Sequence, residues 1–172
     1  MTGVRRILLL SGPNLGALGK RQPEVYGTAT LDEHVEAARA QAAELGYELD
    51  HVQSNHEGAL IDAIHAAAVG GERPAEAIVI NAGALTHTSW ALHDALASFA
   101  GVSIELHISN PAAREPYRHT SVLAPAVDGS IAGFGGLGYP LAVVAVHRLL
   151  GNSGGGPAGG PSTTGAGSGE ST

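Results

Sequence analysis

Three short hydrophobic runs in this chain each end in a cluster of small and polar residues. The runs are residues 7–10, 77–80 and 103–106, and the clusters after them begin at Gly12, Asn81 and His107. Nearly continuous apolar runs are typical of strands that are covered on both faces of a sheet. In a parallel α/β sheet the carboxyl ends of the strands share one edge, so clusters far apart in sequence meet there around one ligand. The pattern predicts such a sheet, with an active site at that edge.

Segments with helical spacing alternate with these runs. Thr30 and Glu33 form a capping-box pattern ahead of apolar residues that recur every three or four positions up to Gly46. Strands are expected over residues 4–10, 47–53, 77–81, 102–107 and 129–134, and helices over 31–45, 59–69, 89–99 and 138–150. Five strands alternating with helices predict an α/β fold, a flavodoxin-like doubly wound parallel sheet of order 2-1-3-4-5. In this order the first and third strands are neighbours, which places Asn14 and Asn81 on either side of a crevice.

The length of the chain favours one domain followed by a tail. At 172 residues the sequence fits a single core, and we expect residues 1–150 to form a catalytic domain. Residues 151–172 are rich in Gly, Pro, Ser and Thr and contain no large apolar side chain, so they cannot offset the entropy of ordering their backbone. We expect this segment to be a disordered tail.

Composition narrows the class of function. The formal charge is −7, with nine Lys and Arg in total, which argues against nucleic-acid binding because phosphate contacts need a basic face. There is no cysteine, so disulfides, thiolate metal sites and thiol nucleophiles are excluded. The apolar run after Arg6 is four residues long, shorter than the roughly 7–15 residues of a signal-peptide core. No segment is expected to span a membrane, and a cytoplasmic protein is predicted.

The few cations follow predicted strands. Arg21, Arg114 and Arg118 all lie in segments after strand ends, which indicates a local anion-binding pocket on an acidic protein. Tyr26 lies five residues after Arg21, in a segment of glycines and charges. To act as a base at neutral pH its phenol needs a pKa lowered by about three units, or roughly 4 kcal/mol, which one or two guanidinium groups could supply. The alternative is an ordinary surface aromatic residue.

A second pair of residues suits acid–base chemistry. Glu105 and His107 are two positions apart on a predicted strand, so both side chains leave the same face. A carboxylate beside an imidazole fixes its tautomer and favours its protonated form. The alternative is a buried pair in which the two side chains only satisfy each other's hydrogen bonds and take no part in chemistry. The backbone N–H groups of Ile108 and Ser109 could hold a carboxylate together with the Asn81 amide, or could simply cap the next turn.

Six segments of the sequence together resemble one enzyme family. They are Gly12-Pro-Asn-Leu15, Arg21-x-Pro-Glu-x-Tyr-Gly27, Asn81-Ala-Gly-Ala-Leu-Thr-His-Thr-Ser89, Glu105-Leu-His-Ile-Ser-Asn110, Arg114-Glu-Pro-Tyr-Arg-His119 and Gly138-Tyr139. In this order and spacing they resemble the type II 3-dehydroquinate dehydratases, from about residue 6 to about residue 150. The resemblance implies removal of water from 3-dehydroquinate through an enolate to give 3-dehydroshikimate, either in the shikimate pathway of aromatic amino acid biosynthesis or in quinate breakdown.

The resemblance also implies a role for each matching residue. Tyr26 would be the base that removes a proton from C2, with Arg21 on the lid lowering its pKa. Asn14, which alone would suit an Asx turn, would hold a water that hydrogen-bonds the developing enolate. His107 would be the general acid that protonates the departing C1 hydroxyl, and Glu105 would orient it.

Further matches imply substrate contacts and an assembly. The residues expected to contact the substrate or the closed lid are Asn81, His87, Ile108, Ser109, Arg114 and Arg118. Asp94 matches a position that reaches into the site of the adjacent subunit, and the resemblance implies a homododecamer built from trimers. No cofactor and no metal is implied.

Two other classes of protein stay open at this point. A flavodoxin-like module that binds a flavin or a phosphorylated ligand needs a phosphate cradle at the first strand end, where Pro13 removes a donor. A metal-dependent hydrolase would have to use some of the nine histidines. Those outside the matching segments show no metal-ligand spacing and are expected to be surface or core residues: His34, His51, His56, His65, His93 and His147.

Overall fold

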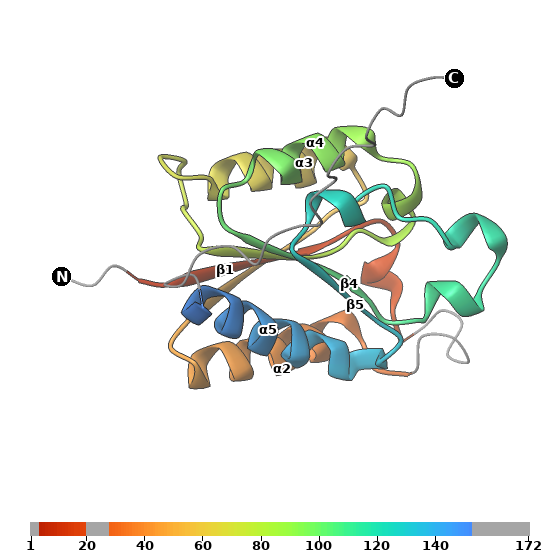
Figure 1. Cartoon of the computed structure of the whole chain (residues 1–172). Helices are drawn as coiled ribbons and strands as arrows, with labels where there is room; N and C mark the ends of the chain where they lie inside the picture. The colour runs from red at the N-terminus through yellow and green to blue at the C-terminus, as the bar shows by residue number, and fades with distance from the viewer. Residues whose placement is uncertain (1–3, 20–27, 153–172) are drawn as a thin grey trace, which may run out of the picture.

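Strands and helices alternate along the chain in the computed structural model, which describes residues 4–19 and 28–152 (Figure 1). Arg21 and Tyr26 lie outside the described residues. The strands are β1 (Arg6–Ser11), β2 (Glu48–Gln53), β3 (Ala77–Asn81), β4 (Val102–His107) and β5 (Gly129–Ala132). The longer helices are α2 (Leu31–Glu44), α3 (Glu57–Ala67), α4 (Trp90–Ser98) and α5 (Gly138–Asn152).

The five strands form one parallel sheet in the order β2-β1-β3-β4-β5. Helices α2 and α5 cover one face of the sheet, and α3 and α4 cover the other (Figure 1). The predicted flavodoxin-like order is therefore confirmed. Ser11 pairs with Asn81, and Ile80 pairs with Glu105, so the central strands end at nearly the same level.

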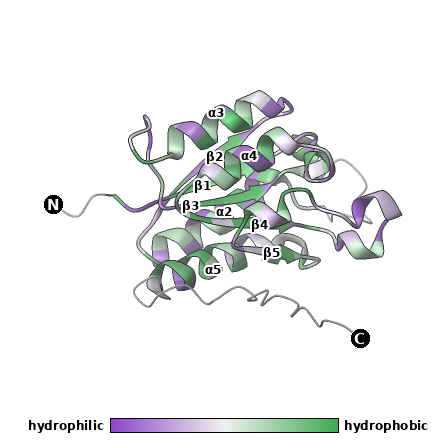
Figure 2. Cartoon of the chain, turned by 45° about the horizontal axis from the view of Figure 1, so that its top comes forward, coloured by the Kyte–Doolittle hydropathy of each residue, from purple (hydrophilic) through white to green (hydrophobic). Residues whose placement is uncertain are grey.

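The hydrophobic core has two halves, one on each face of the sheet. Along β1, Ile7 and Leu9 pack with the residues of α2 and α5, whereas Leu8 and Leu10 pack with those of α3 and α4. Figure 2 shows the apolar strands lying between the two helical layers. Because side chains alternate between faces, a strand covered on both sides is mostly apolar along its whole length, which explains the apolar runs of β1 and β3.

Helix α2 begins at the predicted capping box. The Thr30 hydroxyl oxygen accepts a hydrogen bond from the Glu33 N–H at 3.3 Å, and Glu33 Oε2 accepts one from the Thr30 N–H at 2.7 Å. These bonds satisfy donors that a helix start leaves unpaired. The helix thus begins where the sequence predicts, and its buried residues face α5 and the sheet.

Several element ends differ from the prediction by one or two residues; helix α3, for example, spans Glu57–Ala67 where residues 59–69 are predicted. Strand β5 ends at Ala132, because Gly133 takes a φ of +87° and turns the chain away from the sheet. Helix α5 continues through Gly151 to Asn152, where the sequence predicts that the tail begins. The rest of that segment, residues 153–172, lies outside the described residues, so its disorder stays a prediction.

None of the helices in the described part of the chain is both long enough and apolar enough to cross a membrane.

Candidate active site

One pocket lies at the carboxyl edge of the sheet, where the segments after β1, β3 and β4 meet. It brings together eight residues that the sequence predicts for the site: Asn14, Asn81, His87, His107, Ile108, Ser109, Arg114 and Arg118. Because the central strands end at nearly the same level, residues as far apart in sequence as Asn14 and Arg118 share one cavity.

Two glycines let the loops after β1 and β3 approach closely. A Cβ on Gly12 would lie 2.3 Å from the carbonyl oxygen of Ala82, so only glycine fits there without a backbone shift. Gly83 has a φ of +58°, and a Cβ on it would lie 3.0 Å from the carbonyl oxygen of Pro13. The Gly12 N–H also donates to the carbonyl oxygen of Asn81 at 2.8 Å. The two asparagine-bearing loops are therefore fixed against each other.

Asn14 has a left-handed backbone conformation at the pocket. Its φ is +67°, and within the described ranges it is the one residue other than glycine with a positive φ. Its N–H donates to Asn55 Oδ1 at 2.9 Å, so the conformation is held by a side chain from the loop after β2. Asparagine tolerates this region better than most residues, and such conformations concentrate at functional sites.

Glu105 and His107 form a hydrogen-bonded pair at the wall of the pocket. His107 Nε2 lies 3.0 Å from Glu105 Oε1, and the carboxylate is 1% exposed. Burial alone would raise the pKa of Glu105, but hydrogen bonds from His107, Ser121 and Ser130 hold it below its ordinary value. Glu105 is thus an anion that accepts hydrogen bonds, as the orientation of an imidazole requires.

The Asn81 side chain is oriented by two contacts. Its Oδ1 accepts from the Gly83 N–H at 3.3 Å, and its Nδ2 lies 3.4 Å from the hydroxyl oxygen of Tyr139. Burial raises the pKa of Tyr139 to about 12, so this phenol stays neutral. Because an N–H can only donate, the Gly83 contact assigns the amide oxygen and leaves the second Nδ2 hydrogen for a ligand.

Two arginines line the pocket beside an exposed carboxylate. Glu115 lies 3.0 Å from Arg118 Nε and 3.4 Å from Arg114 Nε, and its side chain is 48% exposed. Both arginine side chains are largely buried along the pocket, and Arg114 also contacts the Ser109 hydroxyl at 3.4 Å. The carboxylate that both guanidinium groups contact is exposed to solvent, so the two arginines are placed to bind an anionic ligand in the pocket.

His87 has its tautomer fixed from outside the pocket. Its Nδ1 lies 2.7 Å from the carbonyl oxygen of Thr120, which accepts only, so Nδ1 carries the proton. In the neutral ring Nε2 is then an acceptor for a hydroxyl group in the pocket.

Asp94 is not part of this pocket. It lies exposed on α4, and the lining of the pocket does not include it. Its predicted contact with an adjacent subunit stays a prediction. Within the described ranges, no three His, Asp or Glu side chains gather as a group that could hold a metal ion.

Several residues around the site are not predicted from the sequence. Pro13, Leu15, Leu18, Gly83, Ala84 and Pro111 complete the lining. Ser121 and Ser130 contact Glu105 from positions 16 and 25 residues away, and no spacing rule links such distant residues. Leu15 and Leu18 had a usable signal, since two leucines in a polar loop at a strand end favour an apolar pocket wall.

Comparisons with known proteins agree with this site. Residues 5–147 match the family Dehydroquinase class II. A 3-dehydroquinate dehydratase from Jannaschia sp. is 50% identical over 150 residues, covering 86% of this chain and 99% of the relative. A catabolic 3-dehydroquinase from Podospora anserina is 49% identical over 155 residues, covering 85% and 96%. The crystal structure of a type II dehydroquinase from Propionibacterium acnes has a TM-score of 0.78 at 42% identity and covers 84% of this chain and 97% of that one. The chain therefore belongs to the class II dehydroquinases.

Proposed function

We propose that this chain dehydrates 3-dehydroquinate to 3-dehydroshikimate through an enolate, with Tyr26 as the base and His107 as the general acid. The observation that carries the proposal is the Glu105–His107 pair at the wall of a pocket that also presents two arginines. The substrate is a carboxylate, and the two arginines of the pocket suit it. The reaction removes one proton, delivers another and breaks one C–O bond, so side-chain acid–base chemistry supplies every step without a cofactor.

His107 delivers the proton that leaves with water. Its Nε2 faces the ionised Glu105, so in the protonated ring Nδ1 carries the second proton. That proton passes to the C1 hydroxyl as the C1–O bond breaks. The enolate then becomes a ketone at C3 with a double bond between C1 and C2, which completes the loss of water.

Tyr26 removes the C2 proton in the first step. Arg21 stabilises its phenolate, and a water held by Asn14 hydrogen-bonds the enolate oxygen as charge develops there. The support for these roles is the match of Arg21 and Tyr26 to the family pattern and the position of Asn14 at the pocket.

The substrate carboxylate binds at the ends of β3 and β4. The backbone N–H groups of Ile108 and Ser109 and the Asn81 amide form the cradle for it, and the three residues all line the pocket. Arg118 and His87 contact the rest of the substrate. Arg114 supports the site through its contact with Ser109.

The working enzyme is a cytoplasmic homododecamer in this proposal. Asp94 lies exposed on α4, from where it reaches the site of an adjacent subunit. Light scattering of the purified chain tests the assembly. A monomer that turns over normally would rule out a contribution from Asp94 of a neighbour.

Absorbance of the conjugated enone after addition of 3-dehydroquinate tests the reaction directly. The wild-type protein should produce it, and Tyr26→Phe should lower kcat by about 10²–10⁴-fold while folding persists. Tyr47→Phe is a matched control, since Tyr47 is a buried tyrosine whose hydroxyl contacts His147 away from the pocket. Absence of the enone with wild-type protein, or near-normal turnover by Tyr26→Phe, would contradict the proposal.

A further inference from the structure

Ser121 contacts the catalytic pair from a loop. Its hydroxyl donates to Glu105 Oε1 at 2.7 Å, and this is the same carboxylate oxygen that lies 3.0 Å from His107 Nε2. Ser130 on β5 donates to the other oxygen at a longer distance of 3.2 Å. The carboxylate of Glu105 therefore has three hydrogen-bond partners, and Ser121 shares an oxygen with the imidazole.

The direction of the Ser121 hydrogen bond is fixed by the backbone. The N–H groups of Leu123 and Ala124 donate to Ser121 Oγ at 3.1 and 3.0 Å. Since these groups only donate, they occupy the acceptor sites of the hydroxyl and leave its proton for Glu105. Ser121 can serve Glu105 only as a donor, so it favours the ionised carboxylate.

The segment around Ser121 is also held against the pocket. The Val122 N–H donates to the carbonyl oxygen of Thr86 at 2.9 Å, and the Thr120 carbonyl oxygen accepts from His87. The segment directly follows Arg118, which lines the pocket. Ser121 thus lies where the arginine-bearing loop, the loop after β3 and the Glu105–His107 pair meet.

We propose that Ser121 is a positioning residue for the dehydration, which holds the Glu105 carboxylate and so sets how firmly His107 keeps the proton that it delivers. The inference rests on the proposed role of His107 as the acid. A carboxylate that accepts several hydrogen bonds is a weaker base, so it draws less on the proton of its imidazole partner. Loss of the Ser121 hydroxyl makes Glu105 a stronger base and His107 a weaker acid.

The charged and titratable groups that face His107 are few in the described part of the chain. Strand β4 contributes Glu105, the segment after β4 contributes Arg114 and Arg118, and the loop after β3 contributes His87. Ser121 and Ser130 do not titrate. A change in the pH profile on removal of either hydroxyl therefore reports on Glu105 and, through it, on His107.

The test is the pH dependence of kcat with 3-dehydroquinate for Ser121→Ala and Ser121→Thr. In Ser121→Ala, we expect kcat to fall several-fold, and the alkaline limb of the kcat profile to move up by roughly 0.5–1 pH unit. Ser121→Thr keeps the hydroxyl, so it should restore most of kcat and most of the wild-type position of the alkaline limb. Ser130→Ala should move the limb in the same direction by less, because its hydrogen bond is longer.

Ser11→Ala is the matched control. Ser11 is a fully buried serine whose hydroxyl contacts an imidazole, His51 Nε2, at 3.0 Å, without touching Glu105. The Ser11→Ala variant should have a lower Tm and an alkaline limb in the wild-type position. If Ser121→Ala lowered Tm and left the limb in place, Ser121 would be structural only and the inference would be wrong.

The turnover of His107→Asn distinguishes an error in the role of Ser121 from an error in the proposed function. If His107→Asn retained normal turnover, the assignment of the acid would fall, whatever Ser121 does. If His107→Asn lost turnover and Ser121→Ala kept the wild-type limb, only the positioning role would fall. If Ser121→Ala does not fold, Ser130→Ala tests the same coupling of a serine hydroxyl through Glu105 to His107. An alkaline limb that Ser130→Ala leaves in place would then overturn the inference.

Discussion

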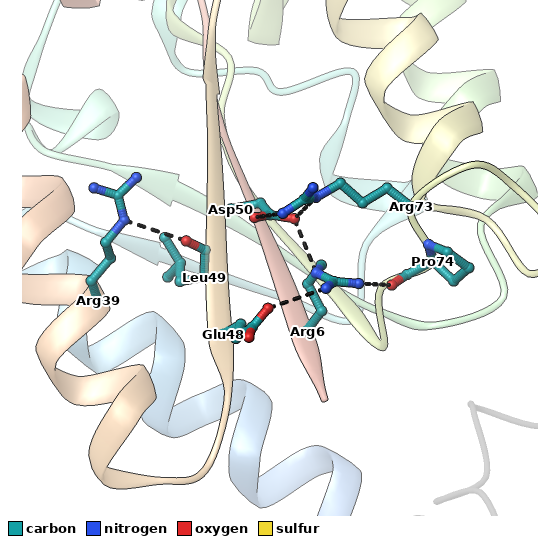
Figure 3. Close-up of polar contacts among 7 residues, drawn as sticks. All are labelled: Arg6, Arg39, Glu48, Leu49, Asp50, Arg73 and Pro74. Atoms are coloured by element: carbon teal, nitrogen blue, oxygen red, sulfur yellow. Dashed lines mark hydrogen bonds and ion pairs between the residues drawn. The ribbon is translucent and has the colours of Figure 1, made fainter. Parts of the chain in front are cut away.

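Two charged clusters lie at opposite ends of the sheet, and they differ in how their charges are balanced. Near the amino ends of β1 and β2, Arg6 lies 3.1 Å from Glu48 and 3.1 Å from Asp50, and Arg73 Nη2 donates to Asp50 at 2.8 Å (Figure 3). This cluster matches two arginines with two carboxylates. At the carboxyl ends, Arg114 and Arg118 have Glu115 between them and face a pocket.

The difference separates a cluster that holds the fold from one that binds a ligand. The amino-end cluster ties edge strand β2 to β1 and to the loop before β3, and Arg39 adds a bond to the carbonyl oxygen of Leu49 (Figure 3). With Glu36, which pairs with Arg39, three arginines there match three carboxylates, so the charges cancel and an anion gains little. The arginines of the carboxyl-end cluster contact an exposed carboxylate and line the pocket beside the Glu105–His107 pair. The partners of the arginines are thus more informative than the number of charged residues.

Replacement of His107 should give the largest effect. His107→Asn removes the acid, so kcat should fall by about 10²–10⁴-fold while Tm changes little. The measurement is the rate of enone formation, with Tm from a thermal scan. Asp50→Asn is the comparison variant from the other cluster, and we expect it to keep the wild-type kcat. Equal losses of kcat in both variants would break the distinction between the clusters.

His34 belongs to neither cluster, and its replacement should stabilise the protein. It is buried, stacks on Tyr139 at 5.1 Å between ring centroids, and its Nε2 has no hydrogen-bond partner in the structure's described part. His34→Leu removes this unsatisfied atom at similar volume, so the free energy of unfolding should rise by about 1 kcal/mol at pH 7.5. Urea denaturation measures it, and a loss of stability would show that the ring stacking outweighs the buried nitrogen.

The same variant has a signed pH dependence. Burial lowers the pKa of His34, with Glu33 opposing the shift, so the unfolded chain binds a proton that the folded chain excludes. The stability of the wild type should therefore fall as the pH drops below about 6.5 toward the lower pKa of the folded state. His34→Leu should reduce this slope. Part of the pH dependence of stability should remain in the variant, because burial and Arg39 also lower the pKa of His51.

Loss of Asp50 should have a smaller effect, confined to stability. Hydrogen bonding by Arg73 outweighs burial and holds the pKa of Asp50 below its ordinary value. Its contribution is present above the unfolded pKa near 4 and is lost as the pH falls through the lower folded pKa. At pH 7, Asp50→Asn should lower the free energy of unfolding by about 0.5–1 kcal/mol, since the cluster is partly exposed. In urea denaturation, the free energy of unfolding should change less between pH 7 and pH 3 in the variant than in the wild type.

Removal of residues 153–172 should have the smallest effect. The segment has no large apolar side chain that could pack, and α5 ends at Asn152. We expect kcat and Tm of the chain ending at Asn152 to match those of the full chain. A fall in Tm of many degrees would show that the tail is docked on the domain.

The fold was predictable because its signals are local. Apolar runs at 7–10 and 77–80, the capping box of Thr30 and the helical spacing after it each follow from neighbouring residues. The site could be located in part for the same reason, since strand ends are visible in sequence and topology brings them together. Asn14, Asn81 and His107 follow from this rule.

The features of the site that could not be predicted are contacts between residues that lie far apart in the sequence. The hydrogen bond from Ser121 to Glu105 requires the loop after β4 to fold back over the strand. Gly12 is necessary because of the carbonyl oxygen of Ala82, which comes from a different strand end. Neither contact has a spacing signature, so only the three-dimensional arrangement reveals it.

Hydrogen–deuterium exchange with and without 3-dehydroshikimate tests most directly which cluster binds the ligand. We expect added protection in peptides covering residues 81–87 and 107–118, which contain residues that line the pocket. Peptides covering Arg6, residues 48–50 and Arg73 should exchange as in the free protein. Protection at the amino-end cluster, with none at the carboxyl edge, would contradict the assignment of the active site.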